Sequence, residues 1–281
     1  MITGWQFLLS RRWAGFLALT IVFALVCVAL SVWQVQRRDD AVAENNRVSA
    51  NYNAAPVEVT DLLANLDSFQ ESQKWRPVLL EGHYLPEEQV LVRNRPQNGQ
   101  PGFEILAPFR LTDGTVFVVD RGWLTTGQQQ DKPDVIPQAP TGDVSVVVRL
   151  KAGEPALGNR TTTPGEVSTI ELPLLAESIG APTYTGAYGS LATESTQAST
   201  GILESEPPQD EGAHLSYAFQ WLVFAVFGFF ALGYAARQEF RSMNADEPEE
   251  QERAEAREKK RLAKDKKDSD VEDEILDAAN K

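Results

Sequence analysis

The chain has 281 residues, 42% of them hydrophobic and 23% charged, and a formal net charge of -14 at pH 7. An acidic chain repels phosphate backbones, so this balance argues against nucleic acid as a partner. The single cysteine, Cys27, lies inside an apolar run, which excludes an intramolecular disulfide and a cysteine metal site outside that run. With two histidines, His83 and His214, a histidine metal cluster or a Ser-His-Asp triad has few possible members.

The first apolar run, residues 13–32, carries no charged side chain. In a helix, at about 1.5 Å per residue, such a run spans the roughly 30 Å hydrocarbon core of a bilayer. Residues 13–35 are therefore predicted to form a transmembrane helix, with Trp13 and Trp33 at its two interfaces. A cleaved export signal is the alternative, because Arg11-Arg12 resembles part of a twin-arginine start. The run is longer than the roughly 7–15 residues of a signal core, which favours retention.

Residues 36–213 combine short β-rich segments with turn signals. A helix that continues from the membrane and then a loop are expected in 41–66. The predicted strands are 77–84, 89–93, 103–111, 115–120 and 144–150, with the first two forming one hairpin and Asp113-Gly114 closing another. Such strands predict a small antiparallel barrel or sandwich, with a helix at 172–179. The stretch 183–211 is rich in Ser, Thr, Gly and Ala, and is predicted to be a loop.

A second run without charge, residues 215–236, predicts a second transmembrane helix over 214–236. Arg237, Arg241 and clusters of Lys and Arg follow it, and such clusters are typical of the cytoplasmic side of a membrane. The segments 1–12 and 237–281 are therefore predicted to be cytoplasmic. The fold class is a plasma-membrane protein whose two transmembrane helices flank a β-rich (α+β) extracytoplasmic domain. The charged tail is expected to be a solvated helix or disordered.

Six motifs follow one another along the chain. They are Trp33-Gln34 with Arg37, Gly82-x-Tyr84, Val90-x-Val92-x-Asn94-Arg95, Gly102-x-Glu104-Ile105-Leu106-x-Pro108-Phe109, Val119-Asp120-Arg121-Gly122-Trp123, and His214-Leu215-x-Tyr217-Ala218-x-Gln220-Trp221. In this order the chain resembles the surfeit locus protein 1 family of cytochrome oxidase assembly factors over most of residues 13–237. The acidic balance and the long charged tail would suit an actinobacterial member. Gly212-Ala213 departs from the Asn-Asn that relatives often show before the histidine.

The resemblance implies a non-enzymatic role in delivering haem a, transiently held, to the core subunit of a haem-copper oxidase. In some bacterial members it implies that the histidine at the start of the second helix, here His214, ligates the haem iron. Tyr217, Gln220 and Trp221, with Trp33 and Gln34 from the first helix, are the other predicted cofactor-binding residues. Simpler alternatives stay open: a solvated interfacial histidine, glutamines that join the two helices, and tryptophans that anchor the interface.

Three arginines in the β-rich region also have alternative interpretations. Arg93 and Arg95 share one face of a strand, either as solvated surface, which is favoured, or as a basic patch for propionates or an oxidase subunit. Arg121 interrupts an apolar segment and is expected to hold a buried hydrogen-bond network. His83 has no second ligand nearby in sequence and is not expected to bind metal.

Two functions from different classes remain. The first is an assembly factor with the oxidase core subunit and membrane lipid as partners. The second is a permanent accessory subunit of the oxidase or of a respiratory supercomplex that does not handle haem. A membrane-anchored hydrolase is a third possibility, but the sequence contains no GxSxG or HExxH motif to support it.

Overall fold

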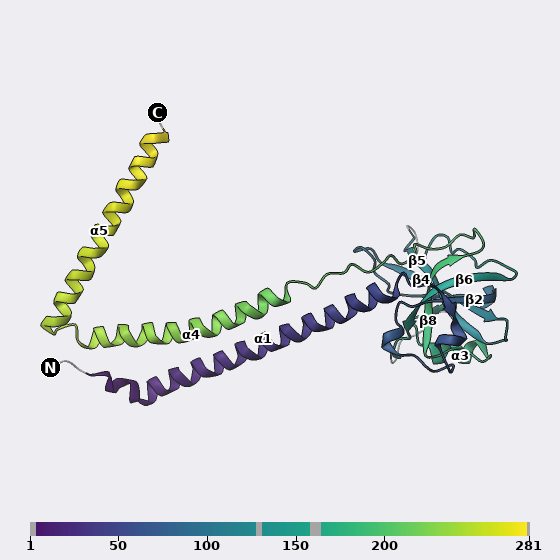
Figure 1. Ribbon diagram of the computed structural model, residues 1–281, viewed down its shortest axis with the longest axis horizontal. Helices are drawn as coiled ribbons and strands as arrows, with labels where there is room; N and C mark the ends of the chain where they lie inside the picture. The colour runs from purple at the N-terminus through teal and green to yellow at the C-terminus, as the bar shows by residue number, and fades with distance from the viewer. Residues whose placement is uncertain (1–3, 128–130, 158–163, 280–281) are drawn as a thin grey trace. The chain divides into compact units, whose positions relative to one another are not determined.

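The computed structural model describes residues 4–127, 131–157 and 164–279 (Figure 1). The chain divides into a helical unit, Met1–Asp39 with Gly212–Lys281, and a β-rich unit, Asp40–Glu211. Helices α1 (Arg11–Asn51) and α4 (His214–Met243) are long and apolar enough to cross a membrane. The predicted order of apolar helix, β-rich domain and apolar helix along the chain is confirmed.

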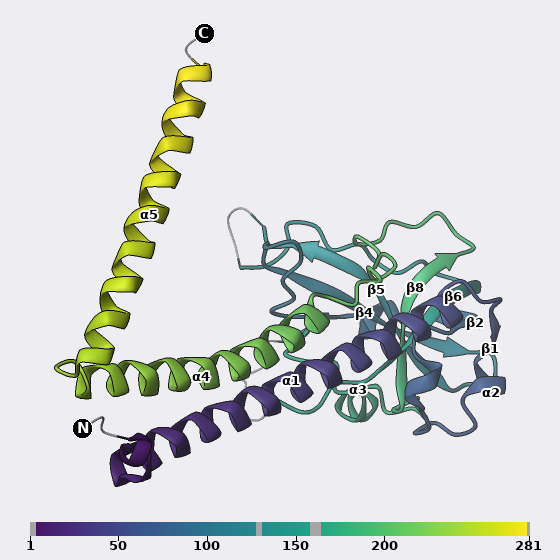
Figure 2. The same cartoon turned by 60° about the vertical axis from the view of Figure 1, so that its left-hand side comes forward.

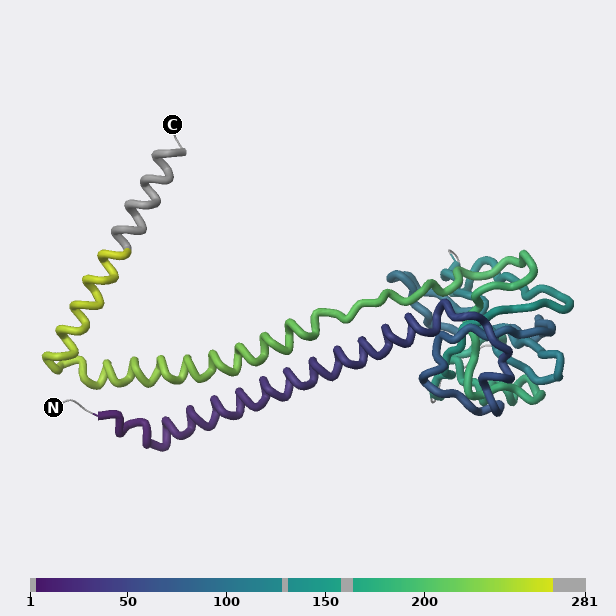
Figure 3. The backbone as a smooth tube through the Cα atoms, in the orientation of Figure 1, coloured from purple at the N-terminus to yellow at the C-terminus, as the bar shows by residue number. Residues whose placement is uncertain are grey.

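Within the helical unit, α1 and α4 lie side by side along their apolar lengths, as Figures 1 and 3 show in one orientation and Figure 2 shows in another. Each helix has a stripe of buried or half-buried positions that repeats every three or four residues. The stripe consists of Thr20, Ala24, Cys27, Ser31 and Gln34 on α1, and of His214, Ala218, Trp221, Ala225 and Gly228 on α4. Most of these side chains are small, which lets two membrane helices approach closely. A Cβ at Gly228 would lie 3.1 Å from the Phe23 ring.

The other faces of the two helices carry large apolar side chains that the protein itself leaves uncovered. Leu19 is 68% exposed and Phe230 is 69% exposed. In a bilayer such side chains contact lipid, which is as apolar as they are. The helical unit also contains a short 3-10 helix, η1 (Trp5–Leu9), and the charged helix α5 (Pro248–Ala279).

The β-rich unit is built on a closed five-stranded barrel. Its strands are β2 (Pro77–Tyr84), β4 (Gly102–Leu111), β5 (Val116–Thr125), β6 (Val144–Ala152) and β8 (Ala187–Glu194). The pairing runs β2-β4-β5-β8-β6 and back to β2, and β5–β8 is its one parallel pair within the described barrel. This is the connectivity of an OB-type barrel, so a barrel replaces the sandwich alternative.

Shorter elements extend the barrel. Strand β1 (Val57–Glu58) pairs with β2, strand β3 (Val90–Val92) pairs with β4, and β7 (Glu166–Val167) pairs with β3. The short helices are α2 (Val59–Leu62), η2 (Glu71–Gln73), η3 (Pro86–Glu88) and α3 (Leu172–Ile179). Figure 2 shows α3 beside the barrel. Leu172 and Leu175 of α3 pack with Leu106 and Val118 of the barrel in a second apolar cluster.

The barrel core is filled by large apolar side chains that alternate along the strands. Val78, Leu80, Phe109, Phe117 and Val148 are all 0% exposed. Inward positions two residues apart are the pattern that β-strands require, and the β-branched and aromatic residues at them suit a pleated surface. The core also needs a close contact of two strands at Gly82, where a Cβ would lie 1.9 Å from the Arg110 carbonyl oxygen.

Several predicted elements are confirmed. Strand β2 and helix α3 begin and end at the predicted residues. Strands β4 and β6 contain the predicted strands, and β5 begins one residue later and ends five residues later than predicted. The Asp113-Gly114 turn joins β4 to β5 in an antiparallel pair. Its geometry is fixed by the Asp113 carboxylate, which accepts hydrogen bonds from the Thr115 N–H at 2.8 Å and the Thr115 hydroxyl at 2.7 Å.

Two predictions for this unit are wrong. Strands β2 and β3 do not form a hairpin, because β3 pairs with β4 and β7 instead. The stretch 183–211 is also not a continuous loop, since it contains β8, which lies between β5 and β6. The Ser, Thr, Gly and Ala content of β8 is typical of a loop, but small residues are needed where β8 packs against β6. A Cβ at Gly189 would lie 2.2 Å from Val148 Cγ2.

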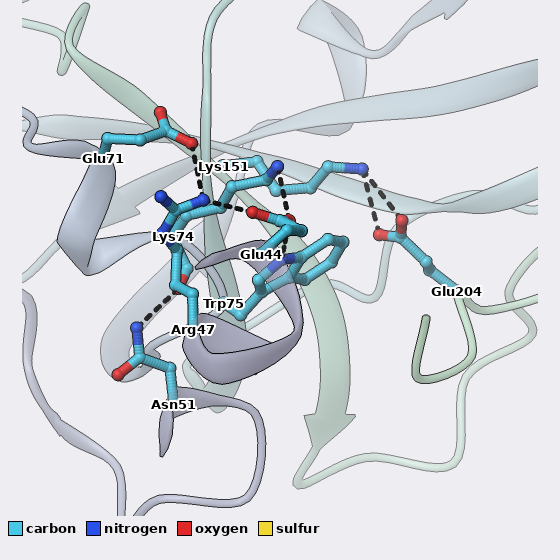
Figure 4. A network of polar contacts seen from close by, with 8 residues as sticks. All are labelled: Glu44, Arg47, Asn51, Glu71, Lys74, Trp75, Lys151 and Glu204. Carbon is cyan, nitrogen blue, oxygen red and sulfur yellow. Dashed lines mark hydrogen bonds and ion pairs between the residues drawn. The ribbon is translucent and has the colours of Figure 1, made fainter. Parts of the chain in front are cut away.

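The last turns of α1 belong to the β-rich unit and are held there by polar contacts (Figure 4). The Glu44 carboxylate accepts hydrogen bonds from Lys74 Nζ at 2.8 Å and Trp75 Nε1 at 2.9 Å. Burial opposes ionisation of Glu44, but these hydrogen bonds outweigh it and lower the carboxyl pKa. Arg47 pairs with Glu71 at 3.1 Å, and the Asn51 amide donates to the Lys74 carbonyl at 2.8 Å. Helix α1 therefore continues to Asn51.

Candidate functional site

The polar contact at the start of α4 joins the two apolar helices. His214 Nδ1 lies 2.8 Å from Gln34 Oε1, across 180 positions of the sequence. Both residues belong to the facing stripes of α1 and α4, and both are half-buried. An amide in an apolar environment needs a partner, and the histidine supplies one. The sequence suggested Gln220 as the partner of Gln34, whereas the structure pairs Gln34 with His214.

This hydrogen bond sets the state of the imidazole. With the Gln34 carbonyl oxygen as the acceptor, Nδ1 of His214 is the donor, and the neutral form of such a ring has its lone pair on Nε2. Histidines that bind metals usually have this arrangement, in which one nitrogen donates to an oxygen and the other is the ligand. The pair fits an axial ligand for haem iron, in which Gln34 would fix the orientation of the ring.

Gly212, two positions before α4 begins, lies close to the His214 ring. Gly212 has φ +67°, a conformation that glycine adopts without strain, and a Cβ there would lie 3.1 Å from both His214 Cδ2 and His214 Nε2. A side chain at position 212 would thus crowd the nitrogen that carries the lone pair. Glycine in place of the asparagine expected from relatives keeps this nitrogen accessible.

The other predicted site residues divide between two faces of the helix pair. Trp221 lies on the α4 stripe that includes His214 and makes an edge contact with Phe224, with ring centroids 5.9 Å apart. Tyr217 and Trp33 are each 51% exposed, and Gln220 is exposed as well. The structure therefore brings together His214, Gln34 and Trp221 on the inner side. Tyr217, Gln220 and Trp33 face outward.

A separate polar centre lies inside the barrel. Arg121 is 0% exposed, and its guanidinium pairs with the Glu194 carboxylate at 3.1 Å. The same guanidinium lies over the Tyr84 ring, 5.1 Å from the ring centroid. The Tyr84 hydroxyl approaches Glu194 at 3.3 Å, and burial raises the pKa of Tyr84 well above its usual value. The network expected around Arg121 is present, and its carboxylate comes from β8, the strand that sequence patterns missed.

A second group of carboxyls lines a pocket of about 260 Å³ on the other side of β5. Burial raises the pKa of Asp120 to about 7, the Glu104 carboxylate adds to the rise, and the Gly122 N–H at 2.9 Å opposes it. Burial also raises the pKa of Glu104, although Arg95 lies beside it at 3.0 Å. The pocket can therefore hold a proton close to neutral pH.

Arg93 and Arg95 are both paired with carboxylates. Arg93 pairs with the buried Glu166 at 3.1 Å, and Arg95 pairs with Glu154 at 2.6 Å. Burial opposes ionisation of Glu154, but the hydrogen bonds from Arg95 and Thr169 outweigh it and lower its pKa to about 2. Both arginines therefore join loops to the barrel. Among the described residues, no group of three or more His, Cys, Asp or Glu could hold a metal ion.

Comparison with known proteins places this arrangement in a family. The sequence model of the SURF1 family matches residues 21–226, which include most of α1, the whole barrel and the first half of α4. The chain belongs to the SURF1 family. A SURF1-like protein of Mycobacterium tuberculosis is 31% identical over 241 residues, covering 84% of this chain and 88% of the relative.

Two eukaryotic relatives match over shorter regions. A SURF1-like protein of Dictyostelium discoideum is 29% identical over 120 residues, which is 41% of this chain and 44% of the relative. The cytochrome oxidase assembly protein SHY1 of Saccharomyces cerevisiae is 27% identical over 131 residues, which is 44% of this chain and 33% of the relative.

The structure gives physical roles to the motifs by which a SURF1 chain resembles its relatives. Gly82 permits the contact of β2 with β4, and Trp123 Nε1 donates to the Arg95 carbonyl at 2.6 Å, which joins two of the motifs. Tyr84 and Arg121 meet in the buried network around Glu194. The motifs in the barrel therefore serve its packing. Those on the helices meet only at His214 and Gln34 within the described contacts.

Proposed function

We propose that this chain is an assembly factor for a haem-copper cytochrome c oxidase, and that it passes haem a to the oxidase core subunit. Two observations support the proposal. The chain belongs to a family in which the yeast relative is named a cytochrome oxidase assembly protein. Its helix pair also brings His214 Nδ1 to 2.8 Å from Gln34 Oε1, a contact that would suit a histidine ligand with a supporting partner. The observation that carries the proposal is the His214–Gln34 hydrogen bond.

In this proposal haem is a cargo, and each residue acts on it by binding or positioning. His214 Nε2 would ligate the iron, and Gln34 would hold the ring through Nδ1. Trp221 lies on the same face of α4, about two helical turns after His214. An aromatic side chain there would pack against the macrocycle. The proposal gives no residue the role of a nucleophile or a base, and the chain would act as a carrier rather than an enzyme.

The membrane arrangement is part of the same proposal. The arginines that follow α4 and those at the start of α1 would lie on the cytoplasmic side of the plasma membrane, which places the β-rich unit outside the cytoplasm. Labelling of cysteines introduced at exposed positions tests this arrangement. Val135 is 75% exposed in the β-rich unit, so Val135→Cys should react with a membrane-impermeant maleimide in intact cells. Reaction only after lysis would contradict it.

A haem titration of the purified full chain tests the histidine. His214→Ala should abolish the spectral change that wild-type protein gives with haem. His83→Ala is the matched control, because His83 is a half-exposed histidine of the barrel, 3.6 Å from Asp143. An unchanged spectrum and affinity in His214→Ala would exclude the ligand role.

The oxidase itself provides the test of function. In a strain without this chain, the oxidase should lose its haem a absorption while the apoprotein of the core subunit is still made. A normal oxidase spectrum in that strain would contradict haem delivery. The outward-facing Tyr217 and Gln220 favour a second candidate, a permanent accessory subunit, since polar side chains on a membrane helix can join it to a neighbour. Stoichiometric co-purification with mature oxidase would favour that alternative.

A further inference from the structure

The end of α4 farthest from His214 forms a basic pocket with helix α5. The cavity measures about 560 Å³ and lies within the helical unit. Four arginines line it, Arg237 and Arg241 from α4 and Arg253 and Arg257 from α5, and its other walls include Trp5 and Phe240. Trp5 stacks on Phe240 with ring centroids 4.4 Å apart, which holds the short helix η1 against α4. We name this cavity the arginine pocket.

The charges of the arginine pocket are unbalanced. Glu250 is its one carboxylate among the described lining residues, and it pairs with Arg257 at 2.7 Å and with Arg253 at 3.7 Å. The hydrogen bond from Arg257 lowers the pKa of Glu250, so this carboxylate stays charged at neutral pH. Arg253 also pairs with Glu249, outside the lining, at 3.6 Å. With both carboxylates counted, four guanidinium groups still face two carboxylates. A cavity with this excess of positive charge attracts an anion, and guanidinium groups match phosphate oxygens in pairs.

The position of the pocket on α4 indicates where the anion comes from. Arg237 is the first charged residue after the apolar span, and Gly233, one turn earlier, forms part of the pocket wall. The same helix face continues into the span with Tyr234 and Phe230, which are 70% and 69% exposed. A headgroup in the pocket would therefore have an apolar surface beside it for acyl chains. A soluble anion would make no use of that surface.

We propose that the arginine pocket binds the phosphate headgroup of an anionic phospholipid. Basic pockets beside membrane helices on the cytoplasmic side have the chemistry to bind such headgroups. The pocket is separate from the haem proposal, because Arg237 follows His214 by 23 residues, or roughly 35 Å along a helix. Failure to bind lipid would leave the role in oxidase assembly untouched.

The test measures retention of single lipids by the full chain in detergent, using native mass spectrometry. Dioleoyl phosphatidylglycerol is the probe and dioleoyl phosphatidylcholine is the neutral control. The wild-type chain should retain phosphatidylglycerol and not phosphatidylcholine. An arginine near an anionic headgroup contributes about fivefold in affinity, so Arg237→Gln with Arg241→Gln should weaken retention roughly 25-fold.

Two further variants separate a built pocket from general attraction to positive charge. Arg237→Lys with Arg241→Lys keeps the charge but removes the paired donors, and should also weaken retention. Lys259→Gln with Lys260→Gln removes two charges from α5 outside the pocket, and should leave retention unchanged. Two results would show that the pocket is not the site. The first is that Lys259→Gln with Lys260→Gln loses as much lipid retention as Arg237→Gln with Arg241→Gln. The second is that Arg237→Lys with Arg241→Lys retains phosphatidylglycerol as well as the wild type does.

A steric variant leaves every charge in place. A Cβ at Gly233 meets nothing within 4 Å, so Gly233→Leu extends into the cavity without a clash and should reduce retention roughly tenfold. Gly15→Leu is the matched control, since Gly15 is another glycine of a membrane helix with open space around it. Equal loss in both variants would contradict the proposal. Inorganic phosphate, added at the same concentration as the lipid, should not compete; equal competition would assign the pocket to a soluble phosphate instead.

Discussion

The barrel and the helix pair place their large apolar side chains in opposite ways. In the barrel, the large side chains point inward and are covered by the protein, as with Phe109 and Phe117 at 0% exposure. In the helix pair, small residues fill the contact and the large ones point outward, as with Leu19 and Phe230. The barrel is therefore stabilised by its own core. The helix pair leaves its large apolar side chains uncovered, which is the pattern expected of helices that contact lipid.

This difference explains where each kind of polar residue is found. In the barrel, buried charges such as Arg121 and Glu194 are paired within a core that would otherwise exclude them. In the helix pair, the polar contact at His214 and Gln34 lies at one end of the stripe and leaves a ring nitrogen for a ligand. The Arg121–Glu194 pair lies within the β-rich unit and joins two of its strands, whereas the His214–Gln34 contact joins two helices.

The largest expected effect comes from truncating the barrel core. Phe109→Ala removes a fully buried ring that makes an edge contact with Tyr84, at a centroid distance of 4.9 Å. Such a truncation costs about 3–5 kcal/mol of unfolding free energy. Hydrogen exchange of the β5 amides in the full chain measures this loss. Phe230→Ala is the control from the helix pair, and it should leave barrel exchange unchanged because its ring is exposed.

A smaller loss is expected from overpacking. Gly189→Ala places a Cβ 2.2 Å from Val148 Cγ2, and the branched valine has no room to move within the barrel. The expected cost is about 1–3 kcal/mol in the same exchange measurement. Gly15→Ala, on a membrane helix with open space around it, should cost nothing in the barrel. Equal stability of the Gly189→Ala protein and the wild type would mean that β8 packs less tightly than the contact with Val148 implies.

A buried carboxyl should make barrel stability depend on pH. The folded pKa of Asp120, about 7, lies above the usual value near 4, so the folded state binds a proton that the unfolded state has released. Stability from this group is present below pH 4 and is lost as pH rises towards 7. Asp120→Asn imitates the protonated form and keeps the acceptor for the Gly122 N–H.

The Asp120→Asn variant should therefore be more stable than the wild type at pH 8 and equal to it near pH 4. Thermal unfolding at the two pH values measures the difference. Glu154→Gln is a control with the opposite sign, because its low pKa of about 2 makes its contribution disappear only in acid. A constant difference between the Asp120→Asn protein and the wild type from pH 4 to pH 8 would contradict the raised pKa.

Sequence patterns predicted the local features of this molecule and missed those that depend on distant partners. The β-branched runs at 77–84 and 144–150 and the apolar spacing of 172–179 are local signals, and the structure has those elements. Strand β8 was missed because Gly189 and its small neighbours are selected by contact with β6, which lies far away in the sequence. The β2–β3 hairpin was wrong for the same reason, since pairing with β4 decides both strands.

The candidate site was predictable in part. The residues at the start of α4 stand out by their polarity in an apolar run, but closeness in sequence did not place them on one face. His214, Ala218, Trp221 and Ala225 follow the helical repeat of the stripe, and this spacing alone could have separated them from Tyr217 and Gln220. The partner of His214 could not be found in this way, because it depends on how α1 and α4 align.

Gln34→Ala is expected to have the smallest effect on stability and a specific effect on haem binding. Gln34→Ala removes one interhelical hydrogen bond, and such bonds contribute only about 0.6 kcal/mol to membrane helix association. The helix pair should therefore remain folded in detergent. If His214 ligates haem, the same change should still weaken haem binding roughly tenfold or more, because a ligand without its supporting partner loses its orientation. Gln220→Ala removes an exposed amide from another face of α4. It should change neither the association of the two helices nor the affinity for haem. Equal haem affinity in the Gln34→Ala and Gln220→Ala proteins would show that this hydrogen bond joins helices without preparing a ligand.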